Sequence, residues 1–151
     1  MKLPVVIGYG NPLRQDDGMG WRAAQLIEQA LAPGAARITQ CHELTPELAA
    51  NLDGASMVIL LDAAVDERPG ETRCRMIHGT EGAKQAAAWS HALSPHQLVG
   101  LADQVNGSVA PVFLISGGVL SVDYGENLTP VAAECAERMA GLALELLGSM
   151  Y

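Results

Sequence analysis

The chain has 151 residues, with nine Lys and Arg against 17 Asp and Glu, so its formal net charge is −8 at pH 7. This acidic balance, with only 4% aromatic residues, excludes a basic duplex-binding face and a base-stacking platform, so no nucleic-acid partner is expected. Hydrophobic residues make up 49% and charged residues 17%, which excludes a disordered chain and predicts a globular protein with a substantial core.

Neither a membrane span nor a disulfide framework is predicted. The longest uncharged stretch, 104–122, contains proline, glycine, asparagine and serine residues that are wrong for a spanning helix. The apolar run at the amino terminus is too short for a signal peptide. Three widely spaced cysteines (Cys41, Cys74 and Cys135) indicate free thiols in a reducing compartment. We therefore expect a cytoplasmic protein with no membrane partner.

In chain order, strand-like and helix-like segments alternate. An apolar run at 3–7 predicts a strand that ends at the glycines after it, and 19–31 has helical spacing of apolar residues. Strands are expected at 35–41, at 56–62, which is apolar throughout, and at 110–116. Polar and apolar residues alternate over 72–77, which is typical of an edge strand.

Three predicted helices begin with the same sequence pattern, a hydroxyl residue followed by proline. Thr45-Pro46, Ser94-Pro95 and Thr129-Pro130 each predict an N-cap with proline at the first helical position, and the last of these helices is expected to run to about Leu147. The alternation predicts an α/β protein: a three-layer α/β/α arrangement with a mostly parallel twisted sheet of about five strands between helices. We expect a single domain over residues 1–151.

The glycine-rich segment after the first strand carries the strongest functional signal. It reads Gly-Tyr-Gly-Asn-Pro-Leu-Arg-Gln-Asp-Asp-Gly-Met-Gly over 8–20. A dinucleotide fingerprint would need a third glycine where Leu13 stands, and two carboxylates before the helix would repel phosphate. Asp16 and Asp17 fit helix capping and a functional role about equally, because one aspartate suffices as a cap.

Two further residues, Asp62 and His96, could form a functional site together with Asp17. Asp62 ends the most apolar predicted strand, and the carboxyl ends of parallel strands line the ligand crevice of such sheets. His96 lies in the first turn of a predicted helix, where the dipole favours the neutral imidazole that binds metals. Two carboxylates and an imidazole suit a borderline divalent ion such as nickel or zinc. Each residue also has a plain reading, as a solvated loop aspartate or a surface histidine.

Other catalytic arrangements have little support. The sequence contains no Gly-x-Ser-x-Gly elbow. Cys41 stands beside His42, but adjacent residues on a strand point to opposite faces, which disfavours a nucleophile pair. A zinc-protease helix starting at His42-Glu43 fails because Pro46 occupies the place of its second histidine.

The first-loop signature resembles the opening signature of the [NiFe]-hydrogenase maturation endopeptidases. The resemblance continues through the strand ending at Asp62, the Ser-Pro-His-Gln-Leu turn at 94–98, the Gly-Leu-Ala-Asp run at 100–103 and the Leu-Thr-Pro at 128–130, and so spans nearly the whole chain. It implies a twisted sheet between helical layers and an aspartate-type, nickel-dependent peptidase. The substrate implied is a [NiFe]-hydrogenase large-subunit precursor, from which the family removes a C-terminal extension after nickel insertion.

On this sequence the family's nickel-contacting side chains fall at Asp17, Asp62 and His96, which we take as a metal-centred catalytic site. The nickel is expected to come from the substrate, and the isolated enzyme, acting as a monomer, is expected to hold no tightly bound metal. Bond cleavage could use nickel as a Lewis acid or a carboxylate that activates water.

One segment departs from the family pattern. Many members have an Asp-Gly-Gly-Thr-like turn after the second strand, whereas this chain reads Gln-Cys-His-Glu over 40–43. Two alternatives stay open: a nickel-binding maturation chaperone without hydrolytic activity, and a nucleotide-binding α/β module.

Overall fold

A computed structural model describes residues 2–79 and 92–149 of the chain. Its five strands form one sheet in the order β2-β1-β3-β5-β4, in which every neighbouring pair is parallel except β4 with β5. The strands are β1 (Val5–Tyr9), β2 (Arg37–Cys41), β3 (Val58–Ala64), β4 (Thr72–Ile77) and β5 (Val112–Gly118). β4, which is antiparallel to its neighbour, lies at one edge of the sheet, as the alternating sequence predicts.

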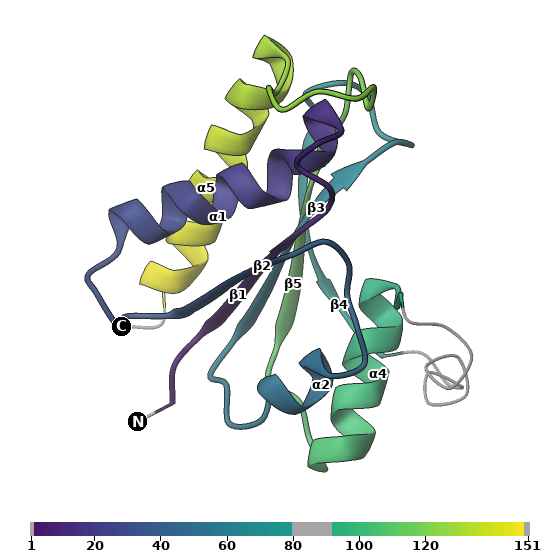
Figure 1. Ribbon diagram of the computed structural model, residues 1–151. Coiled ribbons are helices and arrows are strands. Elements are labelled where there is room, and N and C mark those ends of the chain that lie inside the picture. The colour runs from purple at the N-terminus through teal and green to yellow at the C-terminus, as the bar shows by residue number, and fades with distance from the viewer. Residues whose placement is uncertain (1, 80–91, 150–151) are drawn as a thin grey trace.

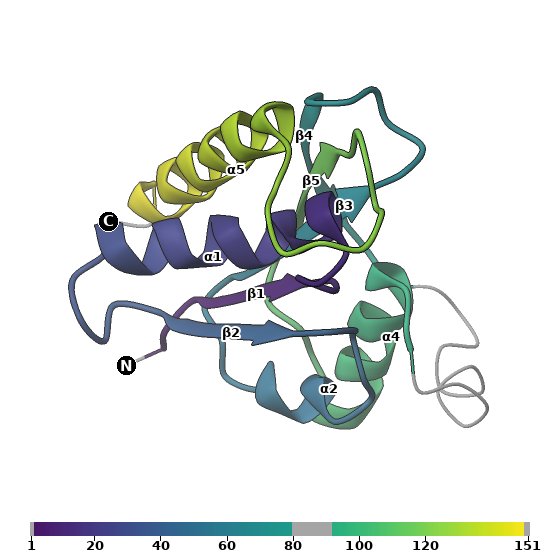
Figure 2. The ribbon, with the colours of Figure 1, turned by 45° about the horizontal axis from the view of Figure 1, so that its top comes forward.

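Helices cover both faces of the sheet (Figures 1 and 2). The helical elements are η1 (Gln15–Gly18), α1 (Met19–Ala30), α2 (Leu48–Asn51), α4 (Pro95–Asn106) and α5 (Pro130–Gly148). α1 and α5 pack together on one face, whereas α2 and α4 pack together on the other. The predicted three-layer α/β/α fold is confirmed. No helix among the described residues is long and apolar enough to cross a membrane.

The core consists of two layers, one on each side of the sheet. Val58 and Leu60 of β3 point to the layer under α2 and α4, and Ile59 and Leu61 point to the layer under α1 and α5. All four side chains are fully buried. This alternation places Asp62, the next even-numbered residue, on the α2/α4 face.

Strands β1, β3 and β5 end two residues later than the sequence predicts. The prediction took Gly8 as the stop of the first strand, but β1 continues to Tyr9. A Cβ atom at Gly8 would lie 2.3 Å from the carbonyl oxygen of Gly20, so the glycine allows α1 to cross the strand closely. β3 likewise continues to Ala64, and Asp62 therefore lies within this strand and not at its end.

Two of the three predicted hydroxyl caps are confirmed. Ser94 accepts a hydrogen bond from the backbone N–H of Gln97 in a full capping box, and Thr129 accepts one from that of Ala132. The prediction for Thr45 was wrong. Residues 45–47 form a turn, in which the carbonyl oxygen of Thr45 accepts from Leu48, and α2 begins only at Leu48 with no side-chain cap.

Candidate functional site

Asp17 is fixed in the loop between β1 and α1 by the backbone before it. The N–H of Asn11 donates a 2.7 Å hydrogen bond to Oδ2 of Asp17. This close approach requires Gly10, whose φ is +134° and whose Cβ, if present, would lie 2.1 Å from the carbonyl oxygen of Asp17. The glycine of the signature therefore permits the loop to fold back on its own aspartate.

The neighbouring Asp16 has a different role. It is completely buried, and its carboxylate accepts hydrogen bonds from the N–H groups of Leu120, Ser121 and Thr129 and from the Thr129 hydroxyl, at 2.8 to 3.1 Å. Burial alone would raise the pKa of Asp16, but these hydrogen bonds outweigh it and lower the pKa. Neither Asp16 nor Asp17 caps α1, whose N-cap is Gly18 with no side-chain hydrogen bond.

The same loop has no backbone amide to offer a phosphate. Each N–H from Gly10 to Asp17, proline excepted, already donates within the protein, to acceptors on Cys41, Asp17, Asn11, Arg14, Gly125 and Ser121. Nucleotide loops bind phosphate through free amides at a helix start. The structure therefore disfavours the nucleotide-binding alternative.

Asp62 lies deep at the carboxyl edge of the sheet, facing the side of α2 and α4. Burial raises the pKa of its carboxyl to about 6. The Tyr9 hydroxyl nearby acts in the opposite direction, although its buried oxygen makes no hydrogen bond of full geometry, and the negative charge of Asp17 raises the pKa further. Asp17 and Asp62 are thus close enough to interact electrostatically.

His96 occupies the first turn of α4, as predicted, behind the Ser94 cap. Its Nδ1 lies 2.8 Å from the carbonyl oxygen of His78, which orients the ring. α4 ends before β5 begins, so the helix runs opposite to the parallel strands and its amino end lies toward the edge where they end. His96 therefore lies on the same side of the sheet, and toward the same edge, as Asp62.

The three side chains do not form a closed metal site. Within residues 2–79 and 92–149, no group of three or more His, Cys, Asp or Glu side chains is arranged to hold a metal ion. Asp17 lies near enough for its charge to raise the pKa of Asp62, and His96 lies on the same side of the sheet as Asp62.

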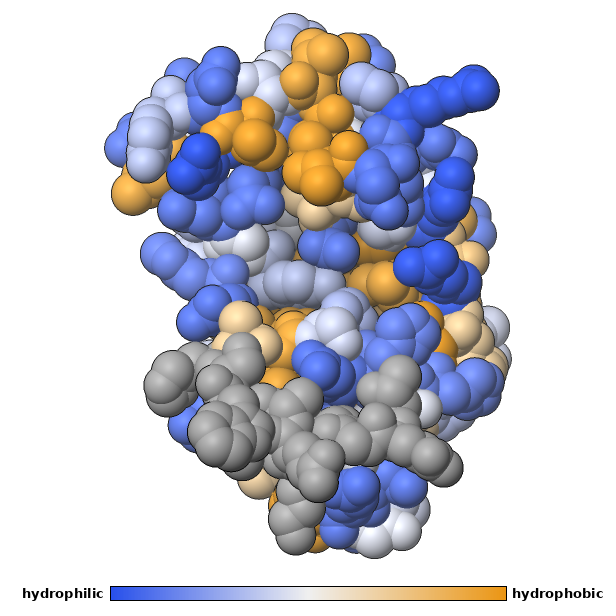
Figure 3. Space-filling model, turned by 90° about the vertical axis from the view of Figure 1, so that its right-hand side faces the viewer, coloured by the Kyte–Doolittle hydropathy of each residue, from blue (hydrophilic) through white to orange (hydrophobic). Residues whose placement is uncertain are grey.

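The side of the molecule that lies at the right in Figure 1 is hollowed across its middle, with hydrophobic side chains gathered above the hollow (Figure 3). Exposed hydrophobic side chains of the loops at the carboxyl edge include Leu13, Val65, Leu120 and Tyr124. A separate hollow of about 550 Å³ lies between β4 and α4, lined by His78, Val99 and Asp103 among others. It includes none of the three predicted site residues.

Structure comparisons find this fold in proteins of known activity. The hydrogenase maturating endopeptidase HybD from E. coli matches with a TM-score of 0.75 and 26% identity, over 99% of this chain and 94% of that one. The [NiFe] hydrogenase maturation protease HycI from Thermococcus kodakarensis matches with a TM-score of 0.70 and 25% identity, over 97% and 93%. No protein-family model matches the chain, and no curated protein matches its sequence.

The chain is a structural relative of the [NiFe]-hydrogenase maturation proteases. The resemblance expected from its sequence is thereby confirmed, and these neighbours support a peptidase role. The contacts of the first-loop signature are now known: Asp16 is bound in the core, and Asp17 is held by the backbone of Asn11.

Residues 40–43, where the sequence departs from the expected family pattern, comprise the end of β2 and the two residues after it, and α1 holds them. Nε1 of Trp21 donates to the carbonyl oxygen of Cys41, and the Trp21 ring meets His42 edge to face at 5.6 Å. The Cys41 side chain packs instead with Tyr9 on the α2/α4 face. The expectation that Cys41 and His42 diverge is confirmed, and no thiol–imidazole pair forms.

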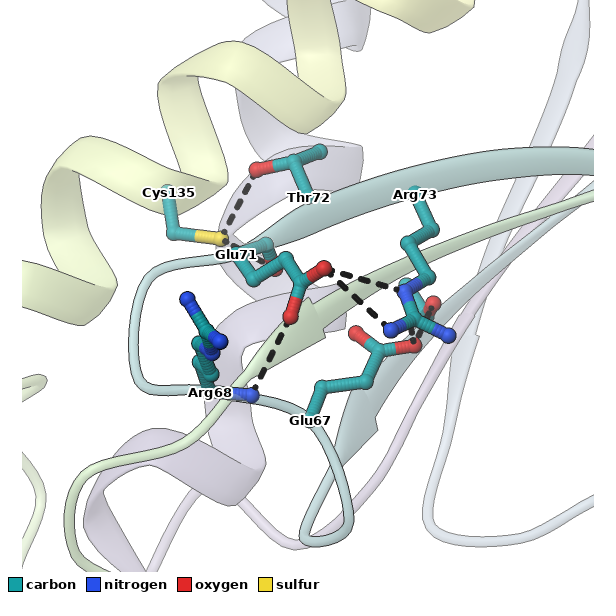
Figure 4. A network of polar contacts seen from close by, with 7 residues as sticks. Glu67, Arg68, Glu71, Thr72, Arg73 and Cys135 are labelled. Atoms are coloured by element: carbon teal, nitrogen blue, oxygen red, sulfur yellow. Dashed lines mark hydrogen bonds and ion pairs between the residues drawn. The ribbon is translucent and has the colours of Figure 1, made fainter.

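Sequence reasoning missed Glu67, in the loop between β3 and β4. Its side chain is only 7% exposed, and its Oε1 accepts a 2.7 Å hydrogen bond from Ser116, the β5 neighbour of Asp62. Arg73 lies over the same carboxylate and also binds Glu71 (Figure 4). A glutamate among exposed loop residues gives no sequence signal, because its burial depends on β5 and β4 beneath it.

Proposed function

We propose that the protein is an endopeptidase that removes the C-terminal extension of a [NiFe]-hydrogenase large-subunit precursor once nickel has been inserted. The observation that carries the proposal is the position of Asp17 and Asp62, two interacting carboxylates at the carboxyl edge of a fold shared with the maturation proteases. His96, toward the same edge, would complete the set. The free thiols of all three cysteines agree with a cytoplasmic location.

In this proposal the nickel belongs to the substrate. Asp17 and Asp62 supply hard oxygen ligands and His96 supplies a nitrogen, a set suited to a borderline cation. Because no described group of residues forms a complete metal site, the protein alone would bind nickel weakly, and a precursor loaded with nickel would supply the missing ligands. Cleavage would then depend on loading. In the alternative in which a carboxylate activates water, Asp62 accepts the proton in place of binding nickel, and its raised pKa suits that role.

The test compares one precursor with and without nickel, using protein stripped by a chelator and reading cleavage on a gel. We expect cleavage of the loaded precursor only. Equal cleavage of the nickel-free precursor would contradict the nickel-dependent step, and binding without cleavage would favour the chaperone alternative.

Three variants test the site. Asp17→Asn, Asp62→Asn and His96→Ala should each reduce cleavage by at least a hundredfold while the thermal unfolding remains cooperative. Asp66→Asn, which changes an exposed aspartate four residues after Asp62, is the matched control and should cleave like the parent protein. Full activity of any one site variant would remove that residue from the site.

A further inference from the structure

Among the residues that the structure describes, strand β4 has a partner on only one side of its backbone. It is the last strand of the sheet and pairs only with β5 (Figures 1 and 2). The carbonyl oxygen of Glu71 accepts from the N–H of Gly118 on β5, so in the alternating antiparallel ladder the backbone groups of Thr72, Cys74 and Met76 point outward. No described residue bonds to them.

The side chains of β4 divide by charge. Arg73 and Arg75 are exposed on the α2/α4 face, while Cys74 and Met76 are exposed on the opposite face. Arg68 lies in the loop just before the strand. Asp66, Glu67 and Glu71 stand in the same segment, and Arg73 pairs with Glu71 and approaches Glu67, so Arg75 supplies the positive charge of this strand that no carboxylate among the described residues shares. Among the described residues, Arg75 makes no ion pair.

We propose that the outer edge of β4 binds an extended acidic segment of the protein substrate by strand addition. An added strand would use the outward backbone groups for hydrogen bonds. Its side chains opposite Arg73 and Arg75 would be acidic, and the alternating ones, near Cys74 and Met76, would be apolar. The proposal rests on the proposed function only in taking the partner to be the substrate.

The position of β4 suits a docking segment outside the scissile bond. Arg73 is the β4 neighbour of Ser116, and Ser116 is the β5 neighbour of Asp62, so the three residues lie on one line across the sheet. With strands about 4.8 Å apart, a strand added to β4 would lie about 14 Å from β3. Four or five extended residues span that distance at about 3.3 Å each. A substrate could therefore dock on β4 while a nearby bond reaches Asp62.

A second copy of this chain is a poor occupant for the same edge. If β4 paired with β4 of another copy, Arg73 and Arg75 would lie opposite the same two arginines of that copy. Like charges opposite each other destabilise a strand pair, and arginine or lysine on an edge protects against such pairing. Pairing of β4 with a second β4 is therefore disfavoured, whereas pairing with an acidic strand is favoured.

The first experiment measures binding of fluorescein-labelled peptides by anisotropy. The acidic probe alternates valine and aspartate over eight residues, and its control replaces every aspartate with lysine. We expect the acidic peptide to bind at least tenfold more tightly. The Arg73→Gln/Arg75→Gln variant should lose at least tenfold, whereas Arg37→Gln, at the opposite edge in β2, should not change binding. Equal binding of the two peptides, or an unchanged double variant, would overturn the proposal.

The second experiment tests the backbone contribution. Cys74→Pro removes one outward N–H at an edge position that tolerates proline, and Cys74→Ser keeps that N–H. The proline variant should bind the acidic peptide at least tenfold more weakly than the serine variant. If it fails to fold, the acidic peptide N-methylated at every second residue must lose the same affinity for the parent protein. Undiminished binding of the N-methylated peptide would overturn strand addition.

The two proposals fail in different ways. Asp62→Asn should abolish cleavage of the precursor and leave peptide binding unchanged. Arg73→Gln/Arg75→Gln should raise the KM for the loaded precursor at least fivefold with kcat within twofold. If the protein binds the acidic peptide but cleaves no precursor, the docking proposal stands and the proposed function is wrong. A dimer in sedimentation that the acidic peptide cannot dissociate would show that the edge serves self-association, and would overturn the docking proposal.

Discussion

Two loops flank Asp62, and they are held in different ways. The loop between β1 and α1 uses its backbone amides within the protein, and its Asp16 is anchored by four hydrogen bonds from the segment between β5 and α5. The loop between β3 and β4 depends on side chains instead, with Glu67 bound by Ser116 and approached by Arg73. Oε2 of Glu67 is buried and has no hydrogen-bond partner among the residues that the structure describes.

The two loops differ in how firmly their buried carboxylates are held. A carboxylate with a full set of backbone donors fixes its loop in one conformation. A carboxylate with one buried, unpaired oxygen has unused hydrogen-bonding capacity, and its arginine partner is half exposed. Among the described residues, the β1–α1 loop is therefore fixed by more hydrogen bonds than the β3–β4 loop.

The largest effect expected is on stability, and it distinguishes the two adjacent aspartates. Asp16→Asn would place an NH₂ group against donors in a fully buried position, and should lower the free energy of unfolding by about 3 kcal/mol or more. Asp17→Asn can keep its single hydrogen bond through the amide oxygen and should lower it by less than about 1 kcal/mol. Urea unfolding of both variants measures this contrast.

The role of Asp16 also predicts how the stability of the protein depends on pH. Because the pKa of Asp16 is lowered in the native state, its contribution is present above the pKa of the unfolded chain and is lost as the pH falls toward the native pKa. The parent protein should therefore lose more stability than Asp16→Asn between neutral and acid pH. Equal losses in the two proteins, or equal stabilities of Asp16→Asn and Asp17→Asn at neutral pH, would contradict the role given to Asp16.

Much of this arrangement could be predicted from the sequence. Apolar runs and, at 72–77, an alternating pattern predicted the five strands, and two of three hydroxyl-proline pairs predicted helix starts. The first-loop signature pointed to Asp17 as a candidate. The distinction between Asp16 and Asp17 could not be predicted, because the donors to Asp16 come from residues more than 100 positions away. Glu67 was missed for the same reason. Its partner Ser116 is 49 residues distant, on a strand that must first pair with β3.

The second effect is smaller and concerns Asp62. Its pKa, raised to about 6 from a usual value near 4, means that the native state binds a proton more tightly than the unfolded chain. Stability should therefore fall as the pH rises from about 4 to about 6, by on the order of 2 kcal/mol, and then level off. Asp62→Asn should remove this fall and be the more stable protein at pH 7. Thermal unfolding at several pH values measures it, and a variant with the same slope as the parent would contradict the assignment.

The smallest effect compares the two loops directly through Asp62. The negative charges of Asp17 and Glu67 both raise the pKa of Asp62, and the contribution of Asp17 is the larger. Asp17→Asn and Glu67→Gln should therefore both lower the Asp62 pKa, the first by more than the second. Carbon NMR of the Asp62 carboxyl follows the titration, with Asp103→Asn, on the exposed surface of α4, as the control. Because Glu67→Gln keeps an oxygen for Ser116, a lowered pKa in this variant reports the lost charge rather than a displaced loop. An Asp62 titration that moves only in Asp17→Asn would mean that the β3–β4 loop affects the site through position alone.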